Sequence, residues 1–391
     1  MQDLGLFILI LIGIAAGFQF GRYYQRKKMK RLSAKIAAYH WPQKRYYQGL
    51  TQLLNDQPDA AIDTFISALE VNADTLETHL ALGNLLRRRG EVDRAIRVHQ
   101  NLLARPSLSK KQSLEAQMEL AVDYMRSGLL DRAESLFKEL AAQNGASKQL
   151  RDKALKNLLE VYQDMREWLS AIDVADQLTT RKFSAKTDLW RERQAQYSCE
   201  IAEEAMAHND WQQARRWLRN AERYDKRCAR ALLLQAKLYY VDQDYANSVA
   251  TLKRVPEIDD RYLPEALAQF VESYRKLQLK KTLLNALIDL YKEYSHLALL
   301  REIIALSLLD DVDFDSLQFD VFEQLNNHQQ LLTHKNLLSI ISQYPTRETL
   351  EAIQALLDSV LHYQCIRCGF SGEVMHWQCP SCKNWGTVFQ V

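Results

Sequence analysis

The chain has 391 residues, which is too long for one compact hydrophobic core and predicts several structural units or a repeat array. Only 12 glycines and 7 prolines interrupt a composition dominated by good helix formers, so we expect a largely helical protein. The formal net charge of +2 argues against a nucleic-acid-binding protein, because such proteins normally carry a large basic excess.

The first segment of the chain is apolar. Residues 4–20 (LGLFILILIGIAAGFQF) carry no charged side chain and are just long enough to cross a bilayer as a helix. A basic cluster follows, made of Arg22, Arg26, Lys27, Lys28, Lys30 and Arg31. Because Lys and Arg are enriched on the cytoplasmic side of membranes, we predict a transmembrane anchor over 1–21, a basic juxtamembrane linker over 22–45, and a cytoplasmic location for the rest. The alternatives are a buried hairpin helix and a cleaved signal peptide, although a signal peptide would carry its basic residues before the apolar stretch.

Residues 46–295 contain an internal repeat. Four positions recur at a period of 34 residues, where Gly49, Ala61, Phe65 and Ala68 correspond to Gly83, Ala95, His99 and Leu102. This spacing resembles the tetratricopeptide repeat, a helix pair in which small residues such as Ala133, Ala171 and Ala214 let the two helices approach closely. We predict about seven such repeats, followed by a helical capping region over 296–360.

A stack of such repeats has a groove lined by the first helix of each pair. The mixture of polar and apolar side chains expected there suits an extended or helical protein segment better than a small molecule. The candidate groove residues are Leu80, Asn84, Arg87, Met118, Val122, Met125, Glu160 and Gln163.

Four cysteines close the chain in two CxxC pairs, Cys365 with Cys368 and Cys379 with Cys382. Two CxxC turns that face each other complete a tetrahedral tetrathiolate site, and a tail this short would depend on the metal for its folding energy. Redox dithiols are the alternative, although two of them so close together would be unusual. The placement of the six cysteines does not suggest a disulfide framework and fits a reducing compartment.

The sequences Cys365-Ile-Arg-Cys368-Gly369 and Cys379-Pro380-Ser381-Cys382 resemble the knuckles of rubredoxin. Two departures are the short loop between the knuckles and Lys383, which stands where a second glycine is expected. The same four sulfurs suit iron and zinc equally, so the metal is left open. His376 is interpreted as a surface or packing residue, and an aromatic flank (Trp377, Trp385 and Phe389) is expected to pack on the helices.

The expected fold class is therefore all-α: a tetratricopeptide repeat superhelix with an N-terminal transmembrane helix and a small C-terminal rubredoxin-like metal knuckle domain, with four cysteine ligands, over 361–391. The sequence contains no GxxxxGK[ST], GxGxxG, HExxH or GxSxG motif, which argues against an enzyme. This order of parts, with its Trp377-to-Cys382 ending, resembles the lipopolysaccharide assembly protein B family of Gram-negative bacteria.

The resemblance implies an inner-membrane adaptor, with its N-terminus in the periplasm, that regulates lipopolysaccharide biosynthesis. Members of this family promote degradation of the lipid A deacetylase LpxC by the membrane-anchored protease FtsH, so the implied partners are FtsH, LpxC and other lipopolysaccharide assembly proteins. Two alternatives stay open, namely rubredoxin-type electron transfer and a generic envelope-assembly scaffold. Formation of a homodimer is also left open.

Overall fold

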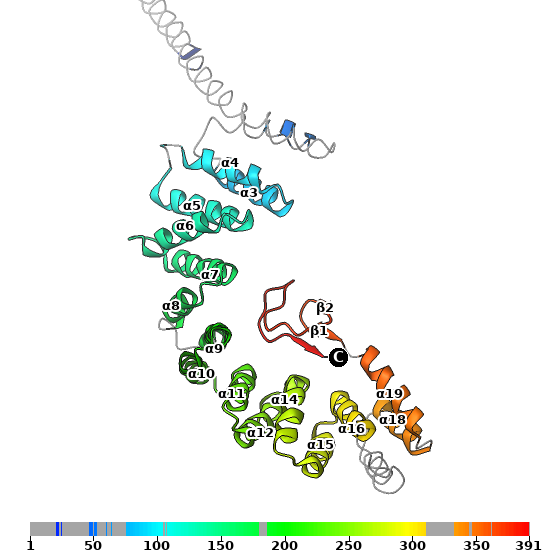
Figure 1. Ribbon diagram of the computed structural model, residues 1–391. Coiled ribbons are helices and arrows are strands. Elements are labelled where there is room, and N and C mark those ends of the chain that lie inside the picture. The colour runs from blue at the N-terminus through cyan, green and yellow to red at the C-terminus, as the bar shows by residue number, and fades with distance from the viewer. Residues whose placement is uncertain are drawn as a thin grey trace, which may run out of the picture. The chain divides into compact units, whose positions relative to one another are not determined.

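The computed structural model describes residues 76–104, 106, 108–179, 186–309, 332–343, 346–360 and 362–390, with a few positions between 21 and 64 (Figure 1). Almost all of the predicted anchor and linker, and most of the first predicted repeat, lie outside these residues. Among the described residues, no helix combines the length and the apolar character needed to cross a membrane. The chain divides into two compact units, Met1–Val161 and Tyr162–Val391.

The first unit is built from pairs of helices, in which α3 packs on α4 and α5 packs on α6. Its helices are α3 (Leu76–Arg88), α4 (Val92–Leu103), α5 (Lys110–Arg126), α6 (Leu130–Ala142) and the greater part of α7 (Lys148–Met165). A capping box begins α5, because Ser109 Oγ accepts from the backbone N–H of Gln112 and Gln112 Oε1 accepts from that of Ser109. Ala95 and Ala133 are completely buried, as expected for residues at which two helices touch.

A buried polar network joins the helix pairs of this unit. His99 occupies the repeat position that Phe65 holds in the sequence pattern, and a Cβ built on Gly83 would overlap the His99 ring. His99 Nδ1 lies 2.5 Å from Asp123 Oδ2, and both side chains are fully buried. Arg87 Nη1 donates to the other carboxylate oxygen of Asp123 at 2.6 Å. The predicted groove residue Arg87 therefore bonds to the next helix pair.

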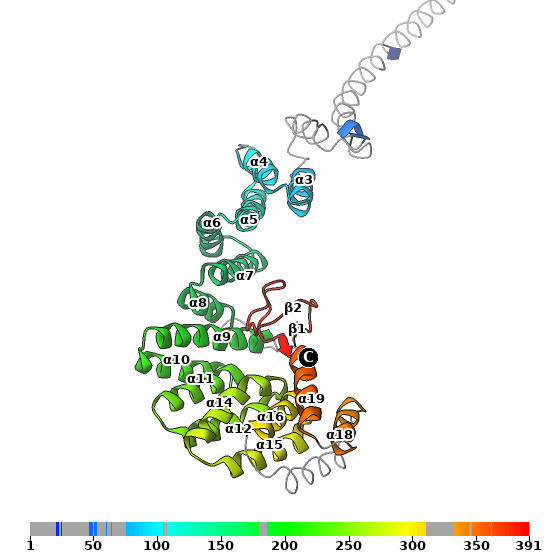
Figure 2. The same ribbon diagram turned by 45° about the vertical axis from the view of Figure 1, so that its right-hand side comes forward.

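The second unit continues with helices and ends in a small sheet (Figure 2). Its helices are α8 (Trp168–Thr179), α9 (Lys186–Ala207), α10 (Trp211–Tyr224), α11 (Ala229–Val241), α12 (Tyr245–Lys253), α13 (Val255–Ile258), the 3₁₀ turn η2 (Asp260–Tyr262), α14 (Leu263–Lys276), α15 (Lys280–Tyr294), α16 (Leu297–Leu309), α18 (Leu332–Gln343) and α19 (Arg347–Val360). Ala171 and Ala214 are again completely buried. The mostly helical repeat fold predicted from the sequence is confirmed for the described residues.

Six turns between successive helices share one geometry. The residue at the turn adopts positive φ, and the backbone N–H that follows it donates to the carbonyl five residues earlier, as Glu91 does to Leu86 at 3.0 Å. This hydrogen bond is typical of a Schellman motif, which provides donors for carbonyls that have no partner within the helix. The turn residues are Gly90, Gly128, Arg166, Asn209, Gln243 and Gln278. Glycine is thus retained in the first two turns, and the same backbone recurs without it in the others.

The C-terminal segment forms a three-stranded antiparallel sheet of order β2-β1-β3. β1 (Tyr363–Cys365) pairs with β2 (Ser371–Gly372) on one side and with β3 (Val388–Gln390) on the other, and Cys365 lies opposite Val388. We call residues 362–390 the knuckle domain. Its small sheet is the one departure from the all-α prediction among the described residues.

Candidate metal centre

The two CxxC segments fold into matching turns. In the first, the backbone N–H of Gly369 donates to the carbonyl of Cys365 at 2.9 Å, and in the second the N–H of Lys383 donates to Cys379 at the same distance. Gly369 has φ 75° and Lys383 has φ 56°, so both knuckles close through a left-handed residue. The sequence pattern correctly predicts two equivalent knuckles.

Lys383 adopts the backbone conformation that favours glycine. A left-handed conformation costs a non-glycine residue on the order of 1 kcal/mol. The lysine side chain supplies an interaction that glycine cannot, because Lys383 Nζ forms an ion pair with Asp164 at the end of α7, with an N···O distance of 2.9 Å. The departure from the rubredoxin pattern therefore leaves the turn intact and links it to the helices.

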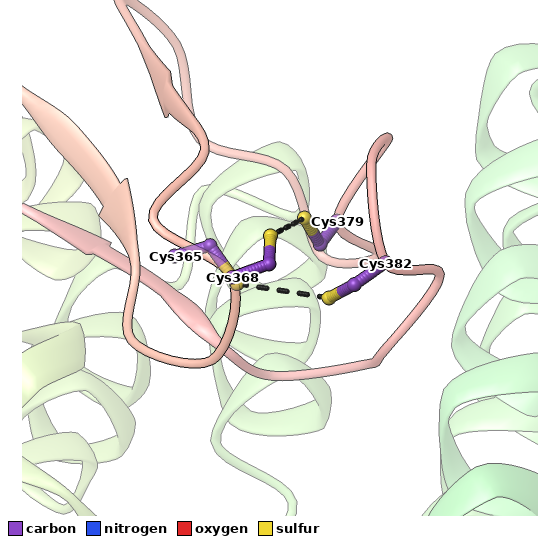
Figure 3. A group of neighbouring side chains, drawn as sticks. All are labelled: Cys365, Cys368, Cys379 and Cys382. Carbon is purple, nitrogen blue, oxygen red and sulfur yellow. Dashed lines mark hydrogen bonds between the residues drawn. The ribbon is translucent and has the colours of Figure 1, made fainter.

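The four sulfurs converge on one point between the knuckles (Figure 3). Cys365 Sγ lies 3.8 Å from Cys382 Sγ, Cys368 Sγ lies 3.6 Å from Cys379 Sγ, and all four lie within 4.8 Å of one another. A tetrahedral ion with metal–sulfur bonds of about 2.3 Å separates its sulfurs by about 3.8 Å. The donor set therefore fits a tetrathiolate-bound metal ion, and His376 is not part of the group that the described residues form.

Hydrogen bonds favour the thiolate form at part of the site. Burial opposes ionisation of Cys365, but the Thr387 hydroxyl, 3.4 Å from its sulfur, and two backbone N–H groups of the knuckle outweigh burial and lower the pKa to about 6. The Asn384 side chain lowers the pKa of Cys382. Burial raises the pKa of Cys379 to about 12, so a bound cation would have to displace its proton.

Four thiolates fill a tetrahedral shell and leave no position for a substrate, which is the arrangement of structural rather than catalytic zinc sites. The same shell holds iron in rubredoxin-type centres, so the donor set does not decide between zinc and iron. Cys365 and Cys379 are buried, whereas Cys368 is exposed. The metal would fix the two knuckles to each other and, through them, the aromatic side chains that flank the second one.

Trp385, just after the second knuckle, packs on the start of the second unit. Its ring lies edge-on to Trp168 and Tyr197, with centroid distances of 6.0 and 5.8 Å. Its indole Nε1–H donates to Gln163 Oε1 at 2.9 Å. The side chain of Gln163, predicted to line the groove, is thus hydrogen-bonded to the chain's own knuckle domain.

Trp377 and Phe389 pack on η2 and α11. Tyr262 lies 5.2 Å from the Trp377 ring and 5.0 Å from the Phe389 ring, between centroids. The guanidinium carbon of Arg230 lies 5.3 Å from the Trp377 centroid and 5.9 Å from that of Trp385, within range of a cation–π interaction. The predicted packing of the aromatic flank on the helices is confirmed.

Arg230 is a buried charge beneath the knuckle domain, and its side chain is only 2 % exposed. Burial alone would lower the pKa of Arg230, but Glu203 and Glu200, each with an oxygen 2.7 Å from Nη2, raise it and keep the guanidinium charged. No motif marks Arg230 in the sequence, so its role could not be predicted.

A hydrogen bond between side chains joins β1 to α14. The Tyr363 hydroxyl donates to Glu265 Oε1 at 2.5 Å. Burial raises the pKa of Glu265, although the hydrogen bond from Tyr363 opposes the shift. The sequence carries no signal for this contact, because the two residues are distant in the chain and neither belongs to a repeat or knuckle pattern.

The comparisons with known proteins agree with this architecture. A family model described as a rubredoxin metal binding domain matches residues 363–389, and tetratricopeptide repeat models match residues 78–111 and 199–262. Among solved structures, a tetratricopeptide repeat protein from Parabacteroides merdae is similar with a TM-score of 0.34 and 13% identity, covering 73% of this chain and 99% of that one. This likeness is too distant to inform function.

Two curated relatives are similar over nearly their full length. Lipopolysaccharide assembly protein B of Escherichia coli (strain K12) is 32% identical, covering 98% of this chain and 97% of the relative. The protein of the same name from Haemophilus influenzae is 29% identical with the same coverage. With its helical repeats, its four converging cysteines and this full-length similarity, the chain belongs to the lipopolysaccharide assembly protein B family.

Proposed function

We propose that this protein is a non-catalytic adaptor in lipopolysaccharide assembly, held at the cytoplasmic face of the inner membrane by residues 1–21. The observation that carries the proposal is the full-length similarity to two proteins named lipopolysaccharide assembly protein B. The closed tetrathiolate arrangement supports a structural role for the metal, since it leaves no coordination site for chemistry.

In its finer form, the proposal is that the adaptor brings the deacetylase LpxC to the protease FtsH and so limits lipopolysaccharide synthesis. The family resemblance supports this assignment, and the apolar segment before a basic cluster supports membrane attachment. Confinement of substrate and protease to one membrane surface raises their local concentration without any catalytic residue.

The metal would act in this function by stabilising a composite surface. Trp377, Trp385 and Phe389 hold the knuckle domain on the repeats through Tyr262 and its neighbours. A partner would therefore meet helices and knuckle domain as one surface, and loss of the metal would remove part of it without unfolding the first unit.

The test is a quantitative pull-down from native membranes, with mass spectrometry of the proteins that copurify. It compares the wild type, a chain lacking residues 1–21, and Cys365→Ser, with Cys199→Ser as a matched cysteine control outside the knuckles. We expect FtsH and LpxC with the wild type and the control, reduced recovery of both without the anchor, and reduced recovery of LpxC with Cys365→Ser. Recovery of neither partner with the wild type would refute the finer proposal.

A further inference from the structure

A cavity of about 560 Å³ lies where the knuckle domain meets the helices of the second unit. Its walls come from α9, from the connection between α10 and α11, from the η2 region and from the knuckle domain, including Trp377 and Trp385. The volume is within the range of about 300–1,000 Å³ typical of ligand sites.

Three guanidinium groups from three separate elements line this cavity without a carboxylate partner among the described residues: Arg193 of α9, Arg227 before α11, and Arg367 of the first knuckle. Arg227 Nη2 donates to the carbonyl of Ile258 at 3.0 Å, and Arg367 Nη1 donates to Asn384 Oδ1 at 2.9 Å. The Arg193 guanidinium lies 5.1 Å from the centroid of the Trp190 ring. Their remaining donors can serve a ligand.

Three carboxylates also line the cavity, Glu192, Asp225 and Asp259, and each already has an interaction within the protein. Asp259 accepts two hydrogen bonds from the guanidinium of Arg261, at 2.8 and 2.6 Å. Asp225 Oδ1 accepts the backbone N–H of Arg227 at 2.8 Å. Arg230, which also lines the cavity, is bonded to glutamates of α9, yet its buried Nε has no hydrogen-bond partner. The site therefore offers an excess of donors suited to carboxylates.

We propose that this cavity binds an acidic, extended segment of a partner protein. Carboxylates of the segment would pair with Arg193, Arg227 and Arg367, and its aliphatic carbons would lie against the rings of Trp377 and Trp385. An extended peptide fits because the basic groups come from three separate elements, α9, the α10–α11 connection and the first knuckle, rather than from one turn or helix end. This inference deepens the proposed adaptor function, on which it rests, by naming the chemistry of the partner.

The test uses a fluorescein-labelled peptide of alternating glutamate and leucine, with a glutamine–leucine peptide as its uncharged counterpart. Binding to the purified full chain in detergent is measured by fluorescence anisotropy at physiological salt. We expect the acidic peptide to bind and the glutamine peptide not to. The combined variant Arg193→Gln, Arg227→Gln and Arg367→Gln should weaken binding by about tenfold, because three charged contacts at exposed or half-buried side chains are lost.

The matched control removes three exposed arginines from the outer face of α10, as Arg216→Gln, Arg219→Gln and Arg223→Gln, and so makes the same change in net charge. Its affinity for the peptide should equal that of the wild type. Equal weakening by the two triple variants would show nonspecific attraction and overturn the proposal. So would absence of peptide binding, or displacement of the peptide by millimolar inorganic phosphate, which would indicate a small-anion site. Metal content and circular dichroism verify that both variants fold.

This assay needs no membrane partner, so its failure would leave the adaptor proposal standing. Conversely, a pull-down that recovers neither FtsH nor LpxC would remove the assignment of those partners but not a measured peptide affinity. The two proposals can therefore fail separately.

Discussion

Replacement of Arg230 by methionine tests whether the buried guanidinium holds the knuckle domain on the helices of the second unit. The change removes two charge-assisted hydrogen bonds of 2.7 Å and two cation–π contacts. Removing one partner of a buried ion pair costs about 3–5 kcal/mol. The side chains of Glu200 and Glu203 are 21% and 40% exposed, so water can solvate these carboxylates once Arg230 is gone. We therefore expect a smaller loss of stability, about 2–3 kcal/mol.

The assay is native-state hydrogen exchange of the amides in α11 and β3, which reports local opening without requiring two-state unfolding of the whole chain. A loss of about 2–3 kcal/mol speeds exchange roughly 30- to 150-fold. Adding Glu200→Gln and Glu203→Gln to Arg230→Met should restore much of the protection, since no unpaired charge then remains. Arg215→Met, which breaks an exposed ion pair with Asp242, is the control and should change exchange by less than about threefold. Exchange in Arg230→Met no faster than in this control would refute the reasoning.

Three further predictions follow from the described contacts. Cys365→Ser should abolish stoichiometric metal binding, measured by elemental analysis of the purified chain, and a retained full equivalent would contradict the four-cysteine site. Gly83→Ala should destabilise the first unit by about 1–3 kcal/mol in denaturant unfolding, because the added methyl group clashes with the buried His99 ring; an unchanged midpoint would show that the ring can move. Since the pKa of Glu265 is raised in the folded state, this group binds more protons folded than unfolded, and its contribution to stability should fall as pH rises above about 4.5. Glu265→Gln, which can still accept a hydrogen bond from Tyr363, should lack this pH-dependent loss of stability. An identical pH profile of unfolding in both proteins would show that Glu265 does not cause it.

Local patterns in the sequence predicted the parts that depend on local chemistry. Two CxxC pairs are sufficient to predict four converging sulfurs, because the knuckle turn is a local structure whose geometry follows from the spacing. Ala95 and Ala214 were identified as helix-contact positions because a repeat places the same packing requirement at the same interval. Lys383 in the left-handed position shows the limit of such patterns, since the expected glycine is absent and the turn is retained.

The docking of the knuckle domain could be predicted only in outline. An aromatic flank implies burial, but it does not say that Trp385 meets Gln163 or that Tyr363 meets Glu265, because each pair joins residues far apart in the chain. Arg230 was missed since a buried arginine in a helix has no distinguishing neighbours in sequence. Its partners become apparent only when α9, α11 and the knuckle domain are placed together.

The aromatic contacts beneath the knuckle domain also bear on the order in which the protein is made. A ribosome synthesises the helices before the knuckle domain, so Trp168, Tyr197 and Tyr262 leave the ribosome before Trp377 and Trp385 exist to cover them. With a tail too short to fold without the metal that its four sulfurs fit, closure would then wait for a metal ion. A nascent or metal-starved chain would thus display an uncovered aromatic surface that chaperones and proteases can recognise, which couples the lifetime of new molecules to the metal supply of the cell.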